Sequence, residues 1–192
     1  MIFVKNEQVG KVKTRLADSV GDKKALEIYQ KLLRHTLDIT QKIKVDREVW
    51  YSEFIPKEDI WPDSLFAKRP QEGDDLGKRM AAAFKDSFEE EGYSKVVIIG
   101  SDCAELTTAI IEEAFKCLEK NDFVIGPAKD GGYYLLGMRN FTSELFEGIS
   151  WSSETVFRST IEKIKDVGAS CAKLDILNDI DTIEDWRSEQ DV

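Results

Sequence analysis

Short apolar runs of strand length alternate with amphipathic helical patterns along this chain, and this alternation constrains the fold more than any other feature. The clearest run, Val96-Val97-Ile98-Ile99, is apolar throughout, which predicts a central strand buried on both faces. Similar runs predict strands at 1–4, 49–51, 65–67, 123–125, 133–136 and 171–176, with 133–136 as a hairpin partner or neighbour of 123–125. Strands that alternate with helices predict an α/β fold with a mostly parallel sheet covered on both faces.

The helical patterns lie between these strand runs. One helix is expected to begin at Asp22, which would cap it, with Tyr29 on its apolar stripe. Another helix follows Gly73-Asp74-Asp75, and Leu76 opens its apolar stripe. A third is capped by Thr107 or Thr108, a fourth spans about 154–165, and a short last one starts near 182.

Length and charge narrow the class of protein. A chain of 192 residues can bury a full core, and without an internal repeat or linker we expect one domain over residues 1–192. A net charge of −10 argues against a nucleic-acid partner, which needs a broad basic face. No apolar run approaches the roughly 20 residues of a membrane helix, and no signal peptide opens the chain, so we expect a cytoplasmic protein with no membrane partner. The sequence is compatible with a homo-oligomer as well as a monomer.

Cysteine and histidine usage excludes several chemistries. The three cysteines are far apart, odd in number and without a CxxC, which argues against a disulfide framework or a structural zinc site. The single histidine, His35, falls in the middle of a helical pattern, where a surface position is the simpler interpretation. A Ser-His-Asp triad or a histidine cluster is therefore not expected.

The loop after the first strand, from Asn6 to Leu16, concentrates positive charge. Together with the preceding Lys5, its candidate phosphate-binding residues are Gly10, Lys13, Thr14 and Arg15. In open α/β sheets ligands bind beyond the carboxyl ends of strands, where such a loop suits phosphate. The alternative is a solvated basic turn, since the loop matches neither a Walker A nor a GxGxxG pattern.

Acidic residues follow two of the predicted strands. Asp102, in Gly100-Ser101-Asp102-Cys103, comes just after the central strand and is a candidate ligand of a hard divalent cation such as Mg²⁺ or Mn²⁺, with Ser101 beside the phosphates. Asp181 is the favoured second metal ligand and Asp179 the reserve, because alternation puts both on one face. In both places the alternative is a cap, and Thr182-x-x-Asp185 resembles a capping box with a shorter acid.

Glycines and aromatic residues mark further candidates. In the segment 126–134, the pair Gly131-Gly132 allows a sharp turn and close approach to a ligand, but a plain hairpin turn explains Asp130-Gly131 equally. Trp151 either stacks on a sugar face or packs in the core. The loop from Gly73 to Gly77 is either a plain helix N-terminus or a contact of the base or ribose.

Six blocks in this order resemble the DUF2064 family of GT-A-like nucleotide-diphospho-sugar transferases. They are Phe3-Val4-Lys5 through Gly10-x-Val12-Lys13-Thr14-Arg15-Leu16, Gly73-x-Asp75-Leu76-Gly77-x-Arg79-Met80, Gly100-Ser101-Asp102-Cys103, Gly126-Pro127-Ala128-x-Asp130-Gly131-Gly132-Tyr133-Tyr134-Leu135, Ile149-x-Trp151-Ser152 and Asp179-Ile180-Asp181-Thr182-x-Glu184-Asp185. The basic loop, the strand-end Asp and the last block are also similar to guanylyltransferases that act on phospholactate or on molybdenum cofactor. Two departures are Ala104 where the family usually has Pro, and Gln8-Val9 where a Pro commonly precedes the glycine.

The resemblance implies a GT-A fold, a Rossmann-like three-layer α/β/α arrangement with a mostly parallel mixed sheet. It implies that Asp102 is the metal-binding acid and that Lys13 and Arg15 meet phosphates. It also implies that the nucleotide contacts Gly73, Asp75 and Gly77, while the stretch from Asp130 to Tyr133 meets the sugar or acceptor.

Three functional hypotheses follow. The first is metal-dependent transfer of a sugar from a nucleotide diphosphate sugar to a small-molecule acceptor, with Asp130 as general base. The second is transfer of a nucleotidyl group from an NTP to a phosphorylated metabolite, with Mg²⁺ held by Asp102 and Asp181. The third is a nucleotide-binding module that has lost catalysis.

Overall fold

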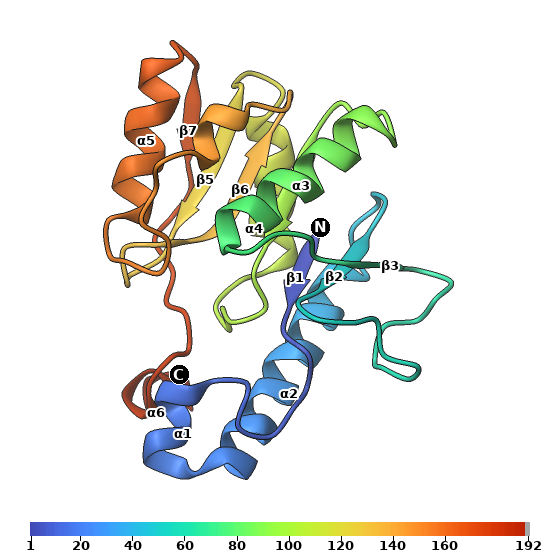
Figure 1. The fold of residues 1–192 in the computed structure, drawn as a ribbon, viewed down its shortest axis with the longest axis vertical. Coiled ribbons are helices and arrows are strands. Elements are labelled where there is room, and N and C mark those ends of the chain that lie inside the picture. The colour runs from blue at the N-terminus through green and yellow to red at the C-terminus, as the bar shows by residue number, and fades with distance from the viewer. Residues whose placement is uncertain (191–192) are drawn as a thin grey trace. The chain divides into compact units, whose positions relative to one another are not determined.

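The computed structural model of the chain describes residues 1–190. These residues form two compact units, each interrupted in sequence. The N-terminal unit comprises Ile2–Pro70, Gly100–Thr108 and the described chain from Asn178 onward, and the central unit comprises Met1, Gln71–Ile99 and Ala109–Leu177. Figure 1 labels the helices and strands of both units.

Three parallel strands form the sheet of the N-terminal unit. β2 (Glu48–Tyr51) lies between β1 (Ile2–Val4) and β3 (Ala67–Pro70) and pairs with both in parallel. Val4, the last residue of β1, is opposite Tyr51, the last residue of β2. The loops that follow these two strands therefore start from one edge of the sheet, which is where open α/β sheets bind ligands.

Three helices complete the N-terminal unit: α1 (Thr14–Val20), α2 (Asp22–Thr40) and α6 (Ile183–Gln190). One apolar cluster joins them. It contains Leu16, Ala25, Ile28, Leu32 and Ile180, with Ala17, Val20, Ala104, Ile183 and Trp186 packed against it. The cluster therefore ties the segment after β1 and the C-terminal segment to the same face of α2.

The loop after β1 is shorter than the sequence predicts. The loop expected over residues 6–16 ends at Lys13, because α1 begins at Thr14 and buries Leu16 completely. The next helix is preceded by Gly21 as its N-cap residue, so the expected cap at Asp22 was wrong and Asp22 lies in the first turn.

The third predicted strand was misplaced by two residues. The strand pairs with β2 at residues 67–70, whereas Phe66, expected within it, is buried against the ring of Trp61 at 5.1 Å between centroids. The apolar signal at 65–67 thus reports packing before the strand rather than the strand itself.

Four strands form the sheet of the central unit in the order β4 (Val96–Ile99), β6 (Tyr133–Met138), β5 (Phe123–Pro127) and β7 (Cys171–Lys173). β6 is antiparallel to both β4 and β5, which confirms the predicted hairpin, and β5 is parallel to β7. Every residue of β4 is buried, as its apolar run predicted. Within the two units the strand pairs are mixed, and parallel pairs are in the majority.

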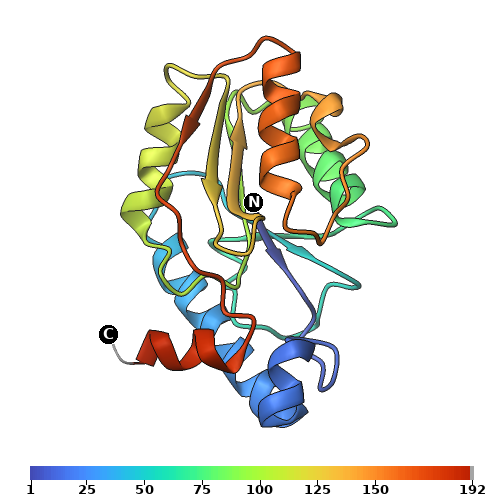
Figure 2. The same cartoon turned by 90° about the vertical axis from the view of Figure 1, so that its left-hand side faces the viewer.

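Helices cover both faces of the central unit's sheet. Figure 2 shows α4 (Thr108–Cys117) on one side and α3 (Leu76–Glu89) with α5 (Val156–Asp166) on the other; a short 3-10 helix, η1, spans Ser143–Phe146. The predicted α/β class is thereby confirmed. Leu76 is the first residue of α3. It was expected to open the apolar stripe of this helix, but its side chain is exposed. Among the helices of residues 1–190, none has the length and apolar character needed to cross a bilayer.

Candidate functional site

Lys13 is the centre of a charged cluster in the N-terminal unit. It occupies the N-cap position of α1 in the left-handed region, at φ 49° and ψ 48°, which costs a residue with a β-carbon roughly 1–2 kcal/mol. Its side chain is only 3% exposed, and its Nζ lies 2.9 Å from Asp102 Oδ2 and 3.4 Å from Asp181 Oδ1. The strained backbone thus accompanies a buried ammonium that faces two carboxylates.

Electrostatics hold the Lys13 ammonium charged. Burial by itself lowers the pKa of a lysine, but the attraction of Asp102, Asp181 and Asp179 outweighs it, and the pKa of Lys13 is raised above its ordinary value. Arg15, in the first turn of α1, adds a second cation at 3.4 Å from Asp181 Oδ2, and its side chain is 73% exposed. The cluster therefore combines one buried cation with one that is open to solvent.

Asp102 is held in place by its backbone and by its neighbour. Its carbonyl oxygen accepts a hydrogen bond from Ile180 N at 2.9 Å, which ties its loop to the segment that carries Asp181. Ser101 is buried, and its hydroxyl lies 3.2 Å from Tyr29 Oη. The carboxylate of Asp102 itself is 39% exposed, so it can face a ligand while it binds Lys13.

The capping alternative is settled for the C-terminal acids. Thr182 N donates to Asp185 Oδ2 at 2.8 Å, and Asp185 N donates to Thr182 Oγ1 at 3.3 Å, which is the reciprocal pattern of a capping box. Asp185 Oδ2 also accepts from Asp181 N at 3.1 Å. The capping role belongs to Thr182 and Asp185, which leaves the Asp181 carboxylate to Lys13 and Arg15.

Tyr29 and Asn6 organise the strand ends behind this cluster. Tyr29 Oη, on α2, accepts from Lys5 N at 2.8 Å and reaches Ser101. Asn6 is buried; its Oδ1 accepts from Glu53 N at 3.0 Å, and its Nδ2 donates to the carbonyl oxygen of Phe54 at 2.8 Å. These bonds fix the loop after β1 against the loop after β2, and Lys5 takes part through its backbone.

Gly10, Lys11 and Thr14, in the same part of the chain as Lys13, are all exposed. Gly10 has a φ of 75°, and a β-carbon there would lie 3.5 Å from Asp22 Oδ2. Thr14 is the first residue of α1 and is exposed. Lys11, in the same loop, is also exposed, in contrast to the buried Lys13.

Gly77 and Trp151 meet in the central unit. A β-carbon on Gly77 would collide with the indole of Trp151, whose ring also stacks on Phe146 at 6.5 Å between centroids. Asp75 is the N-cap residue of α3 and accepts from Lys78 N at 2.8 Å. The packing interpretation thus accounts for the contacts of Trp151 and Gly77, and the predicted contacts with sugar, base or ribose stay predictions.

The turn between β5 and β6 packs against the start of α5. Gly131 has a φ of 89°, a β-carbon there would collide with the backbone of Glu154, and its carbonyl oxygen accepts from Phe157 N at 2.9 Å. Asp130 is exposed, and its Oδ1 accepts from Gly132 N at 2.8 Å. Its carboxylate is accessible to an acceptor hydroxyl, as a general base requires.

Tyr133, at the start of β6, and Gly73, before α3, complete the set in the central unit. The Tyr133 hydroxyl lies 3.7 Å from Met80 Sδ, and burial raises the pKa of that phenol, which therefore stays protonated. Gly73 has a φ of 136° and lies close to Lys78 and Arg79.

Comparison with known proteins identifies the family. The profile described as "Uncharacterized protein conserved in bacteria (DUF2064)" matches residues 36–153. The chain belongs to the DUF2064 family. The matched segment includes Asp102, Asp130 and Trp151, whereas Lys13 and Asp181 lie outside it.

Solved structures confirm the fold of this DUF2064 protein. A crystal structure from Desulfovibrio desulfuricans G20, named "putative nucleotide-diphospho-sugar transferase", is 34% identical, has a TM-score of 0.86, and is matched over 96% of this chain and 82% of that one. The inositol-1-phosphate CTP transferase from T. maritima is 14% identical at a TM-score of 0.61, with coverage of 98% and 93%. Rv0371C from Mycobacterium tuberculosis H37Rv, solved in complex with manganese, is 10% identical and has a TM-score of 0.55. The match covers 99% of this chain and 96% of that one. No curated protein matches significantly. The predicted nucleotide-diphospho-sugar transferase fold is confirmed.

The donor set of the DUF2064 protein fits a divalent ion that is shared with a substrate. Among residues 1–190 no group of three His, Cys, Asp or Glu residues is arranged to hold a metal alone. Mg²⁺, however, is usually held by one or two carboxylates together with substrate phosphates and water. Asp102 and Asp181 already face one cation, the ammonium of Lys13. Burial raises the pKa of the neighbouring Cys103 thiol above its ordinary value.

Sequence reasoning missed Tyr29 and Asn6 as members of this site, whereas the capping role of Asp185 was recognised from its spacing to Thr182. Tyr29 was assigned only to the apolar stripe of α2, although a buried phenol needs a hydrogen-bond partner and so hints at a polar neighbour. Asn6 opens the basic loop but carries no charge. The charged residues were recognisable from their position after strands, whereas those that hold them were not.

Proposed function

We propose that this DUF2064 protein transfers a sugar from a nucleotide diphosphate sugar to a small-molecule acceptor, with Mg²⁺ or Mn²⁺. One observation carries the proposal: Lys13, Asp102 and Asp181 converge from separate segments on one charged cluster of the N-terminal unit, in which the Lys13 side chain is buried. Alternating charges of this kind suit a ligand that brings phosphates and a metal together. The 34% identical relative, named as a transferase of nucleotide diphosphate sugars, supports the same substrate class.

Each residue has a chemical role in the proposal. Asp102 and Asp181 would hold the divalent ion, which supplies positive charge as the diphosphate leaves. Lys13 and Arg15 donate to phosphate oxygens, Arg15 from an exposed position that can reach a ligand. Asp130 takes the proton of the acceptor hydroxyl if the acceptor binds within about 3 Å of its exposed carboxylate.

The remaining predicted contacts belong to the same proposal. Gly131, Gly132, Tyr133 and Trp151 would meet the sugar or acceptor. The loop that carries Gly73, Asp75 and Gly77 would meet the base or ribose. Gly77 and Gly131 pack closely against Trp151 and Glu154, which supports a preorganised binding surface.

A second candidate is nucleotidyl transfer from an NTP to a phosphorylated metabolite, with release of pyrophosphate. The fold shared with the inositol-1-phosphate CTP transferase favours it. The manganese bound by Rv0371C fits either reaction. Both reactions use two carboxylates and a divalent ion against phosphates, so the charged cluster does not distinguish them.

Product analysis separates the reactions. The first step is a thermal-shift screen of nucleotides and nucleotide sugars with and without Mg²⁺ or Mn²⁺, since a ligand at a hundred times its Kd stabilises the native state by about 2.7 kcal/mol. The best donors are then incubated with candidate acceptors. Release of a nucleoside diphosphate supports sugar transfer, and release of pyrophosphate from an NTP supports the second candidate. Tight binding without either product means a binding module that has lost catalysis.

A further inference from the structure

The ammonium of Lys13 faces the same two carboxylates that the proposed function assigns to a divalent ion. Its Nζ lies 2.9 Å from Asp102 Oδ2 and 3.4 Å from Asp181 Oδ1, so both carboxylates already face one cation. A divalent ion bound to the same two oxygens would lie at about 2.1 Å from each. Two cations cannot share these oxygens without strong repulsion at such short range.

The position of Lys13 is built into the fold. Its side chain is 3% exposed and its backbone is held in the left-handed region, which a lysine rarely adopts. Arg15 and Lys11, from the same stretch of chain, are both exposed and do not fill this position. A strained, buried residue at a ligand site points to a functional constraint.

We propose that Lys13 is an internal substitute for the divalent ion: in the free protein it neutralises Asp102 and Asp181, and it prevents the metal from binding alone. This inference rests on the proposed metal site. Phosphate oxygens of a nucleotide offer the ammonium new acceptors, so the nucleotide frees the two carboxylates for the metal. Metal and nucleotide then bind together rather than in sequence, and the carboxylates are never left unpaired.

The inference predicts an effect that loss of a site residue does not usually produce. Removal of the Lys13 charge strengthens binding of the metal alone, because the two carboxylates then lose their buried cation, while the exposed Arg15 still pairs with Asp181. A purely structural role for Lys13 predicts the reverse, since a disordered cluster binds metal less well. In this proposal Lys13 controls when the metal binds, in addition to its role as a phosphate ligand.

The test is a calorimetric titration of Mn²⁺, without nucleotide, into wild-type protein and Lys13→Met. We expect Lys13→Met to bind Mn²⁺ at least tenfold more tightly, which corresponds to about 1.4 kcal/mol. Lys13→Asn serves as a second variant, because Asn adopts the left-handed region readily and preserves the fold. Circular dichroism verifies folding. Adding Asp102→Asn to either variant should return Mn²⁺ affinity to the wild-type level.

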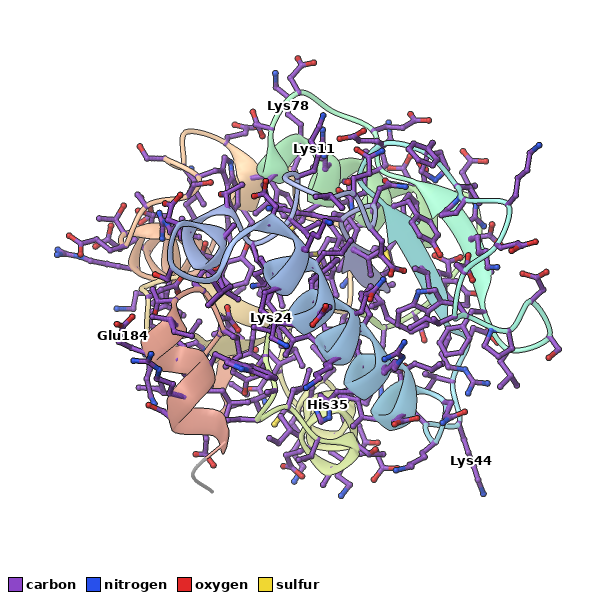
Figure 3. All side chains as sticks on the ribbon, turned by 90° about the horizontal axis from the view of Figure 1, so that it is seen from below. Lys11, Lys24, His35, Lys44, Lys78 and Glu184 are labelled. Atoms are coloured by element: carbon purple, nitrogen blue, oxygen red, sulfur yellow. The ribbon has the colours of Figure 1, made fainter. Side chains whose placement is uncertain are left out.

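Lys44→Met is the matched control. Lys44 is exposed in the turn between α2 and β2, at the edge opposite the carboxyl ends of β1 and β2, and its side chain extends away from the ribbon in Figure 3. Its loss should leave Mn²⁺ affinity unchanged. If both Lys13 variants bind Mn²⁺ no more tightly than wild type, the inference is wrong. The proposed function is judged separately, by whether nucleotide binding with metal depends on Asp102.

Discussion

In the N-terminal unit, Lys13 and Asp102 meet through charged side chains, whereas in the central unit Gly77 and Gly131 matter for the side chains they lack. Gly77 lets Trp151 lie on the backbone of α3, and Gly131 lets a turn lie against the start of α5. The two kinds of site should respond differently to substitution. Changes at the charged cluster should affect ligand binding more than folding, and changes at the glycines should affect folding first.

The largest expected effect is at Gly131. Gly131→Ala forces a β-carbon against the backbone of Glu154 at a φ of 89°, so we expect a loss of about 3 kcal/mol or more in the free energy of unfolding. Urea denaturation measures it. Gly92→Ala is the matched control. Gly92 also has a positive φ, 71°, but a β-carbon added there would meet no heavy atom within 4 Å apart from its chain neighbours. Its loss should be about 1–2 kcal/mol, from the backbone alone. Equal losses would show that the contact with Glu154 does not matter.

The next effect is on ligand binding at Arg15. Its guanidinium is 73% exposed, so Arg15→Ala should hardly change the free energy of unfolding. It should weaken binding of a nucleoside diphosphate by roughly 1.5–3 kcal/mol while leaving the matching nucleoside nearly unaffected, because it removes a charged hydrogen bond to phosphate. Calorimetry with both ligands measures the difference. If Arg15→Ala weakens the binding of the nucleoside diphosphate and of the nucleoside equally, Arg15 does not contact phosphate.

The smallest effect concerns the support of the acidic segment. Asp185→Asn should cost roughly 0.3–1 kcal/mol at pH 7, because it keeps an acceptor for Thr182 N but removes the negative charge near the N-terminus of α6. Burial raises the pKa of Asp185, but hydrogen bonds from Asn178 and Thr182 outweigh this effect. The pKa of Asp185 is therefore held below its ordinary value. The charged Asp185 carboxylate therefore stabilises the folded protein at pH values above its pKa in the unfolded chain, about 3.9. This stabilisation is lost as the pH falls through its lower pKa in the folded protein.

Urea denaturation at pH 7 and at decreasing pH checks this dependence. The difference in stability between wild type and Asp185→Asn should shrink below about pH 4. Glu184→Gln is the control, because Glu184 is exposed on the same turn of α6. A difference that persists unchanged at low pH would contradict the assignment to the Asp185 carboxylate.

Local chemistry made part of the fold and of the candidate site predictable. The apolar run at Val96–Ile99 identified a buried strand, and alternation with helical patterns identified the class. Asp102 and Asp181 were expected around one cation because both follow strands; they lie around the ammonium of Lys13. Their role as metal ligands, and a single domain over residues 1–192, stay predictions.

Long-range contacts account for what the sequence did not predict. The helix at Thr14 begins where Leu16 reaches the core beneath α2, a contact that local propensity does not encode. The left-handed backbone of Lys13 accompanies an ion pair with Asp102, a residue far away in sequence. Tyr29 appeared as one more apolar position, since nothing nearby in the sequence reveals that its hydroxyl meets Ser101.

The proposed chemistry depends on Asp102, and one titration tests it most directly. Mn²⁺ with a nucleoside diphosphate from the thermal-shift screen is titrated calorimetrically into wild type, Asp102→Asn and Asp46→Asn, the last an exposed acid in the turn before β2. Asn preserves size and hydrogen bonding but removes the charge that would hold a divalent ion. We predict that Asp102→Asn folds normally and loses metal-dependent nucleotide binding, while Asp46→Asn matches wild type. Indistinguishable isotherms for Asp102→Asn and wild type would contradict the account.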